Sequence, residues 1–344
     1  MEHSQEVFFE RISVFSDEII GFLRKNVNPN IDESKAKWEY FESERPPIFF
    51  VVKNKKDQSL GAQALIHINA FYKGKKTFTG KSECTFLDDS LRGSTIFKDL
   101  YHEFMSTAKN ENVELIWGLT SATKIWKNKL SFDFADFVIE DFKLSNSPNY
   151  KAALKKSKIH QYVASIIDRY KLRVLPTLGL TIREISELSH EDVEWRTHVL
   201  NELKTVFFIG VEKDYFDWRL KRNPFVSYKI WKIEKGQDLL GYIISSQRNN
   251  RFVIHEWITS DIPSIGTQLN LIRKNLVSVH QEIYYFGNLN HPINDEISRA
   301  WIEQGGVIKT SNWAGLVVKS NTKEVDAMDV KEGLINLLWT EGVN

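Results

Sequence analysis

Cysteine is nearly missing from this sequence, in which Cys84 is the single example among 344 residues. One thiol excludes disulfides within the chain and zinc sites built from several cysteines, and it fits a reducing compartment. An excess of one charge is missing too, because 46 basic and 45 acidic residues leave a formal net charge of +1. A chain without a net positive field holds polyanions poorly, so we expect no nucleic-acid partner.

Long apolar runs are also lacking. No segment reaches the roughly 18 consecutive apolar residues of a membrane span, and the start MEHSQEVFFERISVF carries acids without an apolar signal region. We therefore expect a cytoplasmic protein with no membrane partner. The 42% of hydrophobic and 12% of aromatic residues are enough for buried cores, and the length suits two domains of about 150 residues each.

Two stretches of the sequence resemble each other. One, KWEYFESERPPIFFVVKNKKDQSLGAQALIHI, contains Trp38 and Gly61, and the other, DWRLKRNPFVSYKIWKIEKGQDLLGYIISSQ, contains Trp218 and Gly241 at the same spacing. Each copy continues from its tryptophan through a proline-containing loop, a strand and a Lys-rich turn to a Leu-Gly strand, which predicts one hairpin per half. We interpret the similarity as an internal duplication.

Both halves continue in the same order after the hairpin. The first has SECTFL, a helix at about 94–109, VELIWGL, a helix at about 122–129 and FADFVIE; the second has FVIHEWIT, a helix at about 267–279, EIYYFGNL, a helix at about 295–304 and AGLVVK. This order predicts an α+β (mixed α/β) fold class, with a mixed, mostly antiparallel sheet flanked by helices in each half. We expect domains at 1–150 and 176–344.

A basic amphipathic helix is expected between these domains. The stretch at 151–175 has helical spacing and ends before Pro176. Lys151, Lys155, Lys156 and Lys158 form either a solvated face of this linker helix or a contact for a ligand phosphate.

The stretch LDDSLRGSTIFKDL places an Arg-Gly turn, Arg92 and Gly93, between an apolar strand and an amphipathic helix. With the order of elements around it, this turn resembles the signature Arg/Gln-x-x-Gly-x-Gly/Ala of the GNAT acyltransferases, which binds the pyrophosphate of coenzyme A. The run KNKLSF resembles the family's later Tyr-x-x-Leu-Gly-Phe-like run. Thr95 and Phe97 replace two signature glycines, and Lys127 stands where many relatives have tyrosine.

The resemblance implies a tandem GNAT-like protein that uses acyl-coenzyme A as co-substrate and needs no metal. Implied coenzyme contacts are the strand end, the turn and the start of the helix: Thr85, Phe86, Leu87, Arg92, Gly93, Ser94, Thr95, Ile96 and Phe97. Lys127 is implied either at the 3′-phosphate or as the acid that protonates the leaving thiolate. The corresponding turn of the second half, SDIPSIGTQLNLI, lacks the Arg-Gly pair, so we expect one active site, with the second half serving as a substrate or packing module.

Attack of an amine on a thioester needs a proton acceptor. Glu83, an acid in an apolar strand, is our first candidate, and strand alternation predicts that it shares a face with Thr85, opposite Cys84. His67 is the second candidate, because imidazole changes protonation near neutral pH. Cys84 has no basic neighbour in sequence that would activate it, so a buried structural role is expected.

Acceptor-binding residues are expected in the second half. Tyr215, Trp218 and Arg219 offer rings for a nucleobase and a guanidinium for a pyrophosphate, and His255 and Glu256 repeat the pattern of an acid in an apolar strand. The repeat favours a core role for Trp218 instead, because Trp38 occupies the same place.

The sequence also resembles N-acyltransferases of bacterial surface-sugar and lipopolysaccharide (O-antigen) synthesis. It therefore predicts transfer of an acyl group from acyl-CoA to the amine of an amino sugar, with a dTDP-linked 3-amino-3,6-dideoxyhexose as the expected nucleotide-sugar substrate. Two alternatives stay open. One is a tandem GNAT-like peptidyltransferase that uses aminoacyl-tRNA, and the other is a GNAT-like protein that binds a ligand without catalysis.

Overall fold

The computed structural model describes residues 6–43, 45–91, 94–120, 122–278, 280–288, 291–322, 329–330 and 333. The chain forms two compact units. Unit 1 comprises Met1–Phe137, Val206–Phe225 and Ala314–Gly333, and unit 2 comprises Val138–Thr205, Val226–Trp313 and Leu334–Asn344. The units do not follow one another as the predicted domains 1–150 and 176–344 do, because strands β6 (Asp133–Ser145) and β13 (Val307–Ser320) contribute residues to both.

The sheet of unit 1 is mixed and mostly antiparallel. Its strands lie in the order β1 (Val7–Ile12), β2 (Ile48–Asn54), β3 (Ser59–Tyr72), β4 (Lys75–Leu87), β5 (Leu115–Thr120) and β13. β4 and β5 run parallel, and the other neighbours run antiparallel. The short β8 (Phe207–Ile209) pairs with the end of β3, so a segment from the second half of the sequence belongs to this sheet.

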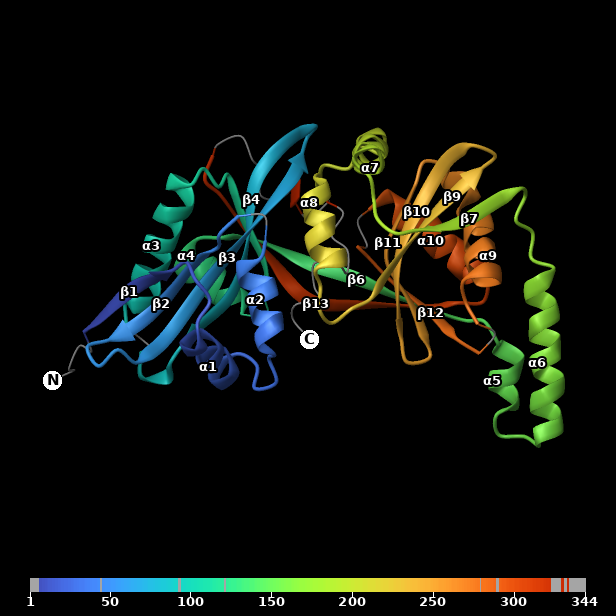
Figure 1. Cartoon of the computed structure of the whole chain (residues 1–344), viewed down its shortest axis with the longest axis horizontal. Coiled ribbons are helices and arrows are strands. Elements are labelled where there is room, and N and C mark those ends of the chain that lie inside the picture. The colour runs from blue at the N-terminus through green and yellow to red at the C-terminus, as the bar shows by residue number, and fades with distance from the viewer. Residues whose placement is uncertain are drawn as a thin grey trace. The chain divides into compact units, whose positions relative to one another are not determined.

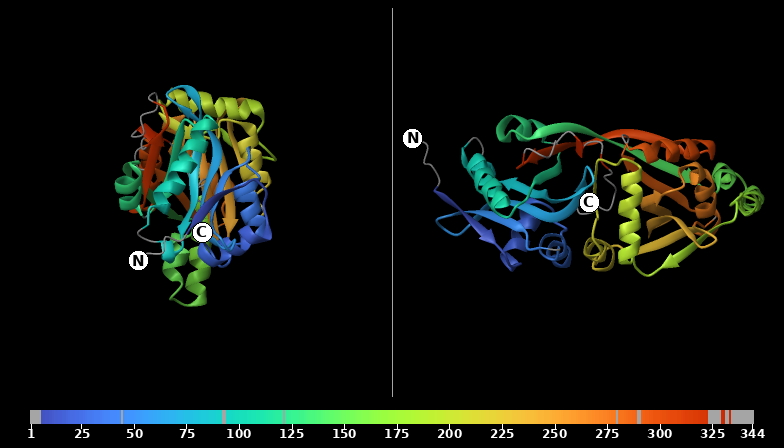
Figure 2. Two further views of the ribbon diagram at one scale, coloured as in Figure 1. Left: turned by 90° about the vertical axis from the view of Figure 1, so that its left-hand side faces the viewer. Right: turned by 90° about the horizontal axis from the view of Figure 1, so that it is seen from above.

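Helices cover both faces of the unit 1 sheet (Figures 1 and 2). They are α1 (Asp17–Asn26), α2 (Glu33–Phe41), α3 (Ile96–Asn110), α4 (Thr123–Leu130) and the short α8 (Lys213–Phe216), which continues into a π-helical turn, Asp217–Lys221. Successive strand residues point to opposite faces. Phe50 packs with α3 and α4, whereas Phe49 stacks on Phe41 of α2. The strand β2 is therefore apolar on both sides and buried throughout.

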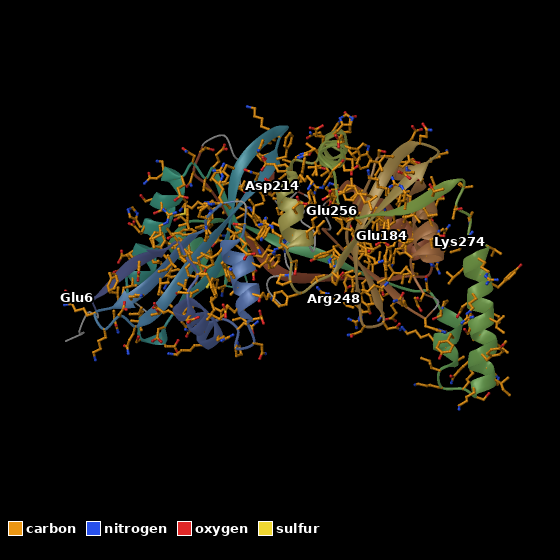
Figure 3. All side chains as sticks on the ribbon, in the orientation of Figure 1. Glu6, Glu184, Asp214, Arg248, Glu256 and Lys274 are labelled. Carbon is orange, nitrogen blue, oxygen red and sulfur yellow. The ribbon has the colours of Figure 1, made fainter. Side chains whose placement is uncertain are left out.

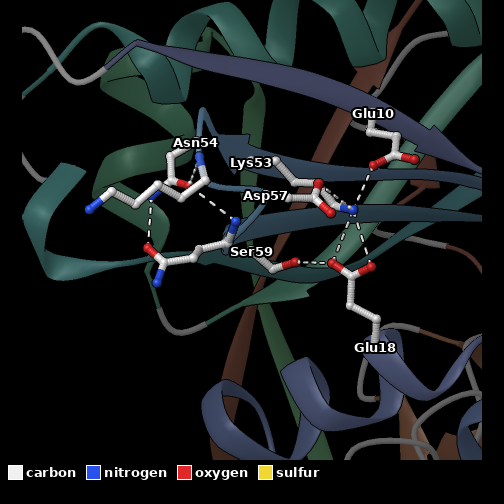
Figure 4. A network of polar contacts seen from close by, with 8 residues as sticks. Glu10, Glu18, Lys53, Asn54, Asp57 and Ser59 are labelled. Atoms are coloured by element: carbon white, nitrogen blue, oxygen red, sulfur yellow. Dashed lines mark hydrogen bonds and ion pairs between the residues drawn. The ribbon is translucent and has the colours of Figure 1, made fainter.

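A buried lysine fixes the first elements of unit 1 (Figure 4). The ammonium of Lys53 in β2 lies 2.8 Å from Glu10 of β1, 3.1 Å from Glu18 of α1 and 3.2 Å from Asp57 in the following turn. Ser59 donates a hydrogen bond to Glu18 at 2.7 Å. Because Lys53 is almost fully buried, its charge depends on these carboxylates, and the contacts hold β1 and α1 against the hairpin β2–β3.

The sheet of unit 2 repeats the same pairing pattern. Its strands lie in the order β6, β12 (Glu282–Asn288), β11 (Arg251–Thr259), β10 (Asp238–Arg248), β9 (Tyr228–Lys235) and β7 (Leu180–Ile185). β11 and β12 are the parallel pair, in the place that β4 and β5 take in unit 1. Strands are also exchanged between the two halves of the sequence, since β13 pairs with β5 and β6 pairs with β12.

Helices flank this second sheet as well: α5 (Pro148–Ala153), α6 (Lys158–Arg173), α7 (His190–Glu202), α9 (Ile265–Asn275) and α10 (Pro292–Glu303). The core on one face is built from α9 and α10, and Arg196 of α7 reaches the other face. The mixed α/β class with two helix-flanked, mostly antiparallel sheets is thus confirmed.

The single helix expected at 151–175 is instead two helices. Between α5 and α6 the chain leaves helical geometry, and Ser157 is extended at the N-cap of α6. The side-chain amide of Gln161 donates to the carbonyls of Leu154 and Lys156 at 3.2 and 3.1 Å. Side-chain bonds of this kind satisfy backbone groups that a continuous helix would pair internally.

Within the ranges given above, every helix is too short or too polar to cross a bilayer.

Candidate functional site

The candidate site of unit 1 lies where two parallel strands separate. β4 and β5 pair only from Thr79 to Lys81 and from Leu115 to Trp117, and beyond these residues the ladder stops. A cavity of about 640 Å³ lies in the opening. Its walls come from β4, the turn after β4, β5, β13, the start of α3, and α4: Ser82, Glu83, Cys84, Thr85, Phe86, Leu87, Leu91, Ser94, Phe97, Gly118, Leu119, Thr120, Ala122, Ile125, Trp126, Lys129 and Val317.

A β-bulge shapes the β4 wall of this cavity. Ala62 of β3 pairs with Phe86, but Ala64 pairs with Glu83, so β4 has one residue more than β3 here. Cys84 adopts φ of 53°, the left-handed region that side chains rarely occupy. The expected alternation of Glu83 and Thr85 opposite Cys84 was wrong, because the bulge interrupts the pleat and all three line the cavity.

Gln63 of β3 holds the bulge. Its amide nitrogen donates to Ser82 Oγ at 2.8 Å and to the Glu83 carbonyl at 3.3 Å, and its oxygen accepts from Thr85 Oγ1 and from the Tyr101 hydroxyl, both at 2.6 Å. Gln63 is fully buried, so these bonds satisfy an amide that is costly to bury alone. Sequence reasoning missed this residue, although a glutamine in an apolar strand was a visible signal.

Glu83 lies at the cavity wall and forms an ion pair with the buried Lys81. Behind it lies a second acid that sequence reasoning missed, Glu39 of α2. Glu39 is only 3% exposed, and its Oε2 atom has no hydrogen-bond partner. Burial first, and then the charge of Glu83, raise the pKa of Glu39 to about 7, against the opposing effect of Lys81 and Arg219. Two interacting carboxylates therefore occur at the bulge.

Cys84 contributes a buried thiol to the cavity wall. Burial raises the pKa of this thiol far above its ordinary value, and the charges of Glu83 and Glu39 add to the effect. The protonated thiol is a poor nucleophile at neutral pH.

The start of α3 forms one end of the cavity. Arg92 and Gly93 lie outside the described residues. Ser94 and Phe97 line the cavity, while Thr95 is the N-cap residue, with its hydroxyl donating to Asp99 at 2.9 Å. The first backbone N–H groups of a helix have no partner within the helix and favour negative charge. The start of α3 therefore lies at this cavity, and an anion-binding role for Ile96 and Phe97 stays a prediction.

The lysine that faces the cavity from α4 is Lys129. Ile125, Trp126 and Lys129 line it together because residues three and four apart share a helix face. Lys127 is exposed and lies outside the lining. The structure thus places Lys129, rather than the predicted Lys127, in the lining of this cavity.

His67 lies outside the cavity lining. It pairs across the sheet with Gly80 of β4, before the strands separate, and its Nε2 atom is 3.6 Å from Glu111. Burial lowers the pKa of His67 to about 4, although Glu111 partly opposes the shift. The ring is therefore neutral at physiological pH and accepts protons weakly.

The expected acceptor-binding residues are buried. Tyr215, Trp218 and Arg219 belong to unit 1, where the Arg219 guanidinium lies 4.9 Å from the ring centre of Trp38. His255 and Glu256 belong to unit 2 and are buried there; Glu256 is labelled in Figure 3.

The buried groups of unit 2 bond to protein partners. Arg196 donates two hydrogen bonds to Glu256 at 2.9 and 3.0 Å, and the Tyr242 hydroxyl also donates to Glu256. His255 is hydrogen-bonded to Ser246 at 2.7 Å. These contacts pair the Glu256 carboxylate and the Nε2 atom of His255 within the protein. A ligand role for the five residues stays a prediction.

In unit 2, the stretch SDIPSIGTQLNLI corresponds to the Arg-Gly turn of unit 1, and its residues bond to other protein groups. Gln268 of α9 donates to Thr259 Oγ1 at 2.7 Å and to Ser264 Oγ at 2.8 Å, and its oxygen accepts from Trp257 at 3.0 Å. Trp257 and Gln268 are both buried. The contacts are consistent with a packing role for this half.

Comparison with known proteins gives structural matches only. No protein-family model matches the sequence, and no curated protein matches it. A GCN5-related N-acetyltransferase (GNAT) from Anabaena variabilis superposes with a TM-score of 0.63 at 12% identity, covering 91% of this chain and 73% of that one. N-myristoyltransferase of Saccharomyces cerevisiae with bound myristoyl-CoA gives 0.53 at 10% identity, covering 90% and 78%.

A third match concerns the arrangement in two units. A tandem GNAT protein from the clavulanic acid biosynthesis pathway gives a TM-score of 0.54 at 10% identity, covering 93% of this chain and all of that one. Together with the repeated sheets, these similarities show that the chain has a tandem GNAT fold.

Proposed function

We propose that unit 1 is an N-acyltransferase that moves an acyl group from acyl-coenzyme A to a primary amine. The bulged strand at the opening between β4 and β5 is the observation that carries this proposal. The pantetheine arm lies along Thr85, Phe86 and Leu87, and the phosphates bind the start of α3. The yeast protein with bound myristoyl-CoA supports a coenzyme in this fold.

In the reaction, the neutral amine attacks the thioester carbon through a tetrahedral oxyanion. A C–N bond forms, the C–S bond breaks, and the released thiolate takes a proton from water. A backbone amide at the bulge stabilises the oxyanion. Glu83, in the cavity wall, accepts the amine proton. Because the two carboxylates interact, a change in the charge of Glu83 changes the protonation of Glu39, whose pKa is raised.

As acceptor we propose a nucleotide-linked amino sugar, a dTDP-linked 3-amino-3,6-dideoxyhexose in the first instance. The sequence resemblance to surface-sugar N-acyltransferases supports this choice. The near-neutral net charge argues against an aminoacyl-tRNA donor, since polyanion binding rests on basic surface.

Calorimetric titration of the full chain with coenzyme A tests the donor site. We expect binding at one site per chain, weakened in Lys129→Ala and unchanged in Lys124→Ala, an exposed lysine of the same helix outside the lining. Folded protein that shows no binding at millimolar coenzyme refutes the proposal. Mass spectrometry with a panel of acyl-CoAs and amino-sugar nucleotides then identifies the acyl group and the acceptor.

A further inference from the structure

Helix α6 exposes a continuous apolar face. Half of the large hydrophobic side chains that are exposed in the described residues lie between positions 154 and 174: Leu154, Ile159, Tyr162, Val163, Ile166, Ile167, Tyr170 and Val174. Ile159 is 74% exposed, and Tyr162 is 70% exposed. Isolated exposed apolar residues are ordinary, but a contiguous patch of this kind marks an interaction surface.

This face points away from the rest of unit 2. The buried residues of α6 are Ala164, Asp168 and Leu172, at four-residue spacing. With about 100° of rotation per residue, the exposed apolar residues cover an arc of about 140° on the opposite side of the helix. Figure 1 shows α6 at one end of the unit, next to α5. One side of α6 therefore packs on the rest of the unit, and the apolar side is available to another partner.

Basic residues border the apolar face on both sides. Lys158, Arg169 and Arg173 follow one edge, Lys171 and His160 follow the other, and all five are exposed. Lys155 and Lys156 precede the helix and are exposed too.

Acid is missing from this surface. The one acid between positions 154 and 178 is Asp168, which is buried and accepts bonds from the amide N–H of Tyr150 and the side chain of Asn149. The exposed face of α6 is thus purely apolar and cationic.

We propose that α6 docks the protein on an anionic lipid surface, lying in the plane of the interface. An apolar stripe bordered by Lys and Arg has the chemistry of interfacial helices, in which apolar side chains enter the acyl boundary and cations meet the lipid headgroups. A helix of 16 residues is about 24 Å long, too short to span a bilayer but suited to lie on it.

The positive charge along α6 favours lipid over a second copy of the chain as the partner that covers its apolar face. Two α6 helices placed face to face would bring the cations of both copies together without intervening acids. An anionic leaflet neutralises the same cations, at about fivefold in affinity for each Lys or Arg near the surface. The expectation of no membrane partner rested on the lack of spanning segments, and peripheral docking revises it.

Vesicle co-sedimentation of the full chain tests the proposal. We expect binding to equimolar phosphatidylserine and phosphatidylcholine, weak binding to phosphatidylcholine alone, and loss of binding at high salt. Ile166→Glu should abolish the binding, and Lys158→Ala and Arg169→Ala should each weaken it about fivefold. Ile302→Glu, at a 62% exposed isoleucine of α10 in the same unit, is the matched control and should bind normally.

Three outcomes overturn the proposal. They are wild-type protein that stays in the supernatant with anionic vesicles, equal binding to neutral and anionic vesicles, and a concentration-dependent dimer, without vesicle binding, that Ile166→Glu dissociates. Circular dichroism of each variant keeps the test valid, because exposed substitutions should leave the unfolding temperature unchanged. Coenzyme binding should also be unchanged, so failure here is distinct from failure of the acyltransferase proposal.

Discussion

Trp38 and Trp218 each donate the indole N–H to the backbone carbonyl of the other, at 2.9 and 3.0 Å. They lie 180 positions apart, the interval of the sequence repeat, and their rings pack at 5.7 Å. Each copy of the repeat thus supplies the same donor and the same acceptor. The core role that the repeat favoured for Trp218 agrees with this contact, since both rings are almost fully buried.

Replacement of either tryptophan should destabilise unit 1. Trp38→Phe and Trp218→Phe each leave one buried carbonyl without its donor, which costs about 1–3 kcal/mol in the free energy of unfolding. Chemical denaturation of the two single variants and the double variant gives the coupling between them. Strict additivity would show that the two hydrogen bonds act independently.

Gln63 should matter for coenzyme binding as well as for stability. Gln63→Leu leaves the hydroxyls of Thr85 and Tyr101 without their acceptor, so we expect a loss of about 1–3 kcal/mol in stability and weaker binding of coenzyme A by calorimetry. Gln268→Leu is the matched control, because Gln268 is a fully buried glutamine of unit 2. It should lose similar stability and keep its affinity. Equal affinities in both variants would contradict the role of Gln63 at the bulge.

Periodicity made much of the fold predictable. The i+4 spacing in the helix expected at 94–109 agrees with α3, which buries Leu100, Phe104 and Ala108. The two hairpins and the strand–helix order were predicted for the same reason, because each element's pattern is local. Strand exchange between the two halves of the sequence was not predictable this way, since pairing of β13 with β5 depends on contacts distant in sequence.

The site was less predictable than the fold. The bulge carries no glycine or proline, and Cys84 takes a positive φ without a sequence signal for it. Alternation therefore misassigned the faces. Glu39 is an ordinary charged residue next to Trp38 in the sequence, and only the tertiary fold buries it near Glu83. Lys127 was chosen for its place in the run KNKLSF, and the rotation of α4, which the sequence does not show, brings Lys129 into the cavity lining instead.

The Arg196–Glu256 pair should be a structural element of unit 2. Arg196→Ala leaves a buried carboxylate without its counter-charge, so we expect a loss of about 3–5 kcal/mol in the free energy of unfolding. The double variant Arg196→Met with Glu256→Leu should recover most of this loss, because no charge then stays buried. A double variant as unstable as Arg196→Ala would count against the explanation. Thermal unfolding followed by circular dichroism measures both.

Glu39 should make stability depend on pH. Its carboxyl has an ordinary pKa of 4.5 and a folded-state pKa of about 7, so between these values the folded state keeps a proton that the unfolded state releases. The stability that this bound proton gives to the folded state is fully present below pH 4.5 and is lost as pH rises to 7. The free energy of unfolding falls by about 3 kcal/mol in total over this range. Glu83, Lys81, Arg219 and Lys35 are the charges that act on it.

Glu39→Gln should remove this slope, because an amide of the same shape does not titrate. Denaturation at pH 5 and pH 8 should therefore show a variant that gains stability over wild type at the higher pH and differs little at the lower one. Glu83→Gln should leave the lower end of this pH window in place and lower its upper end, so that less stability is lost. The substitution removes the neighbouring negative charge that helps to raise the folded-state pKa of Glu39. Parallel stability curves for wild type and Glu39→Gln would show that this carboxyl does not hold the proton.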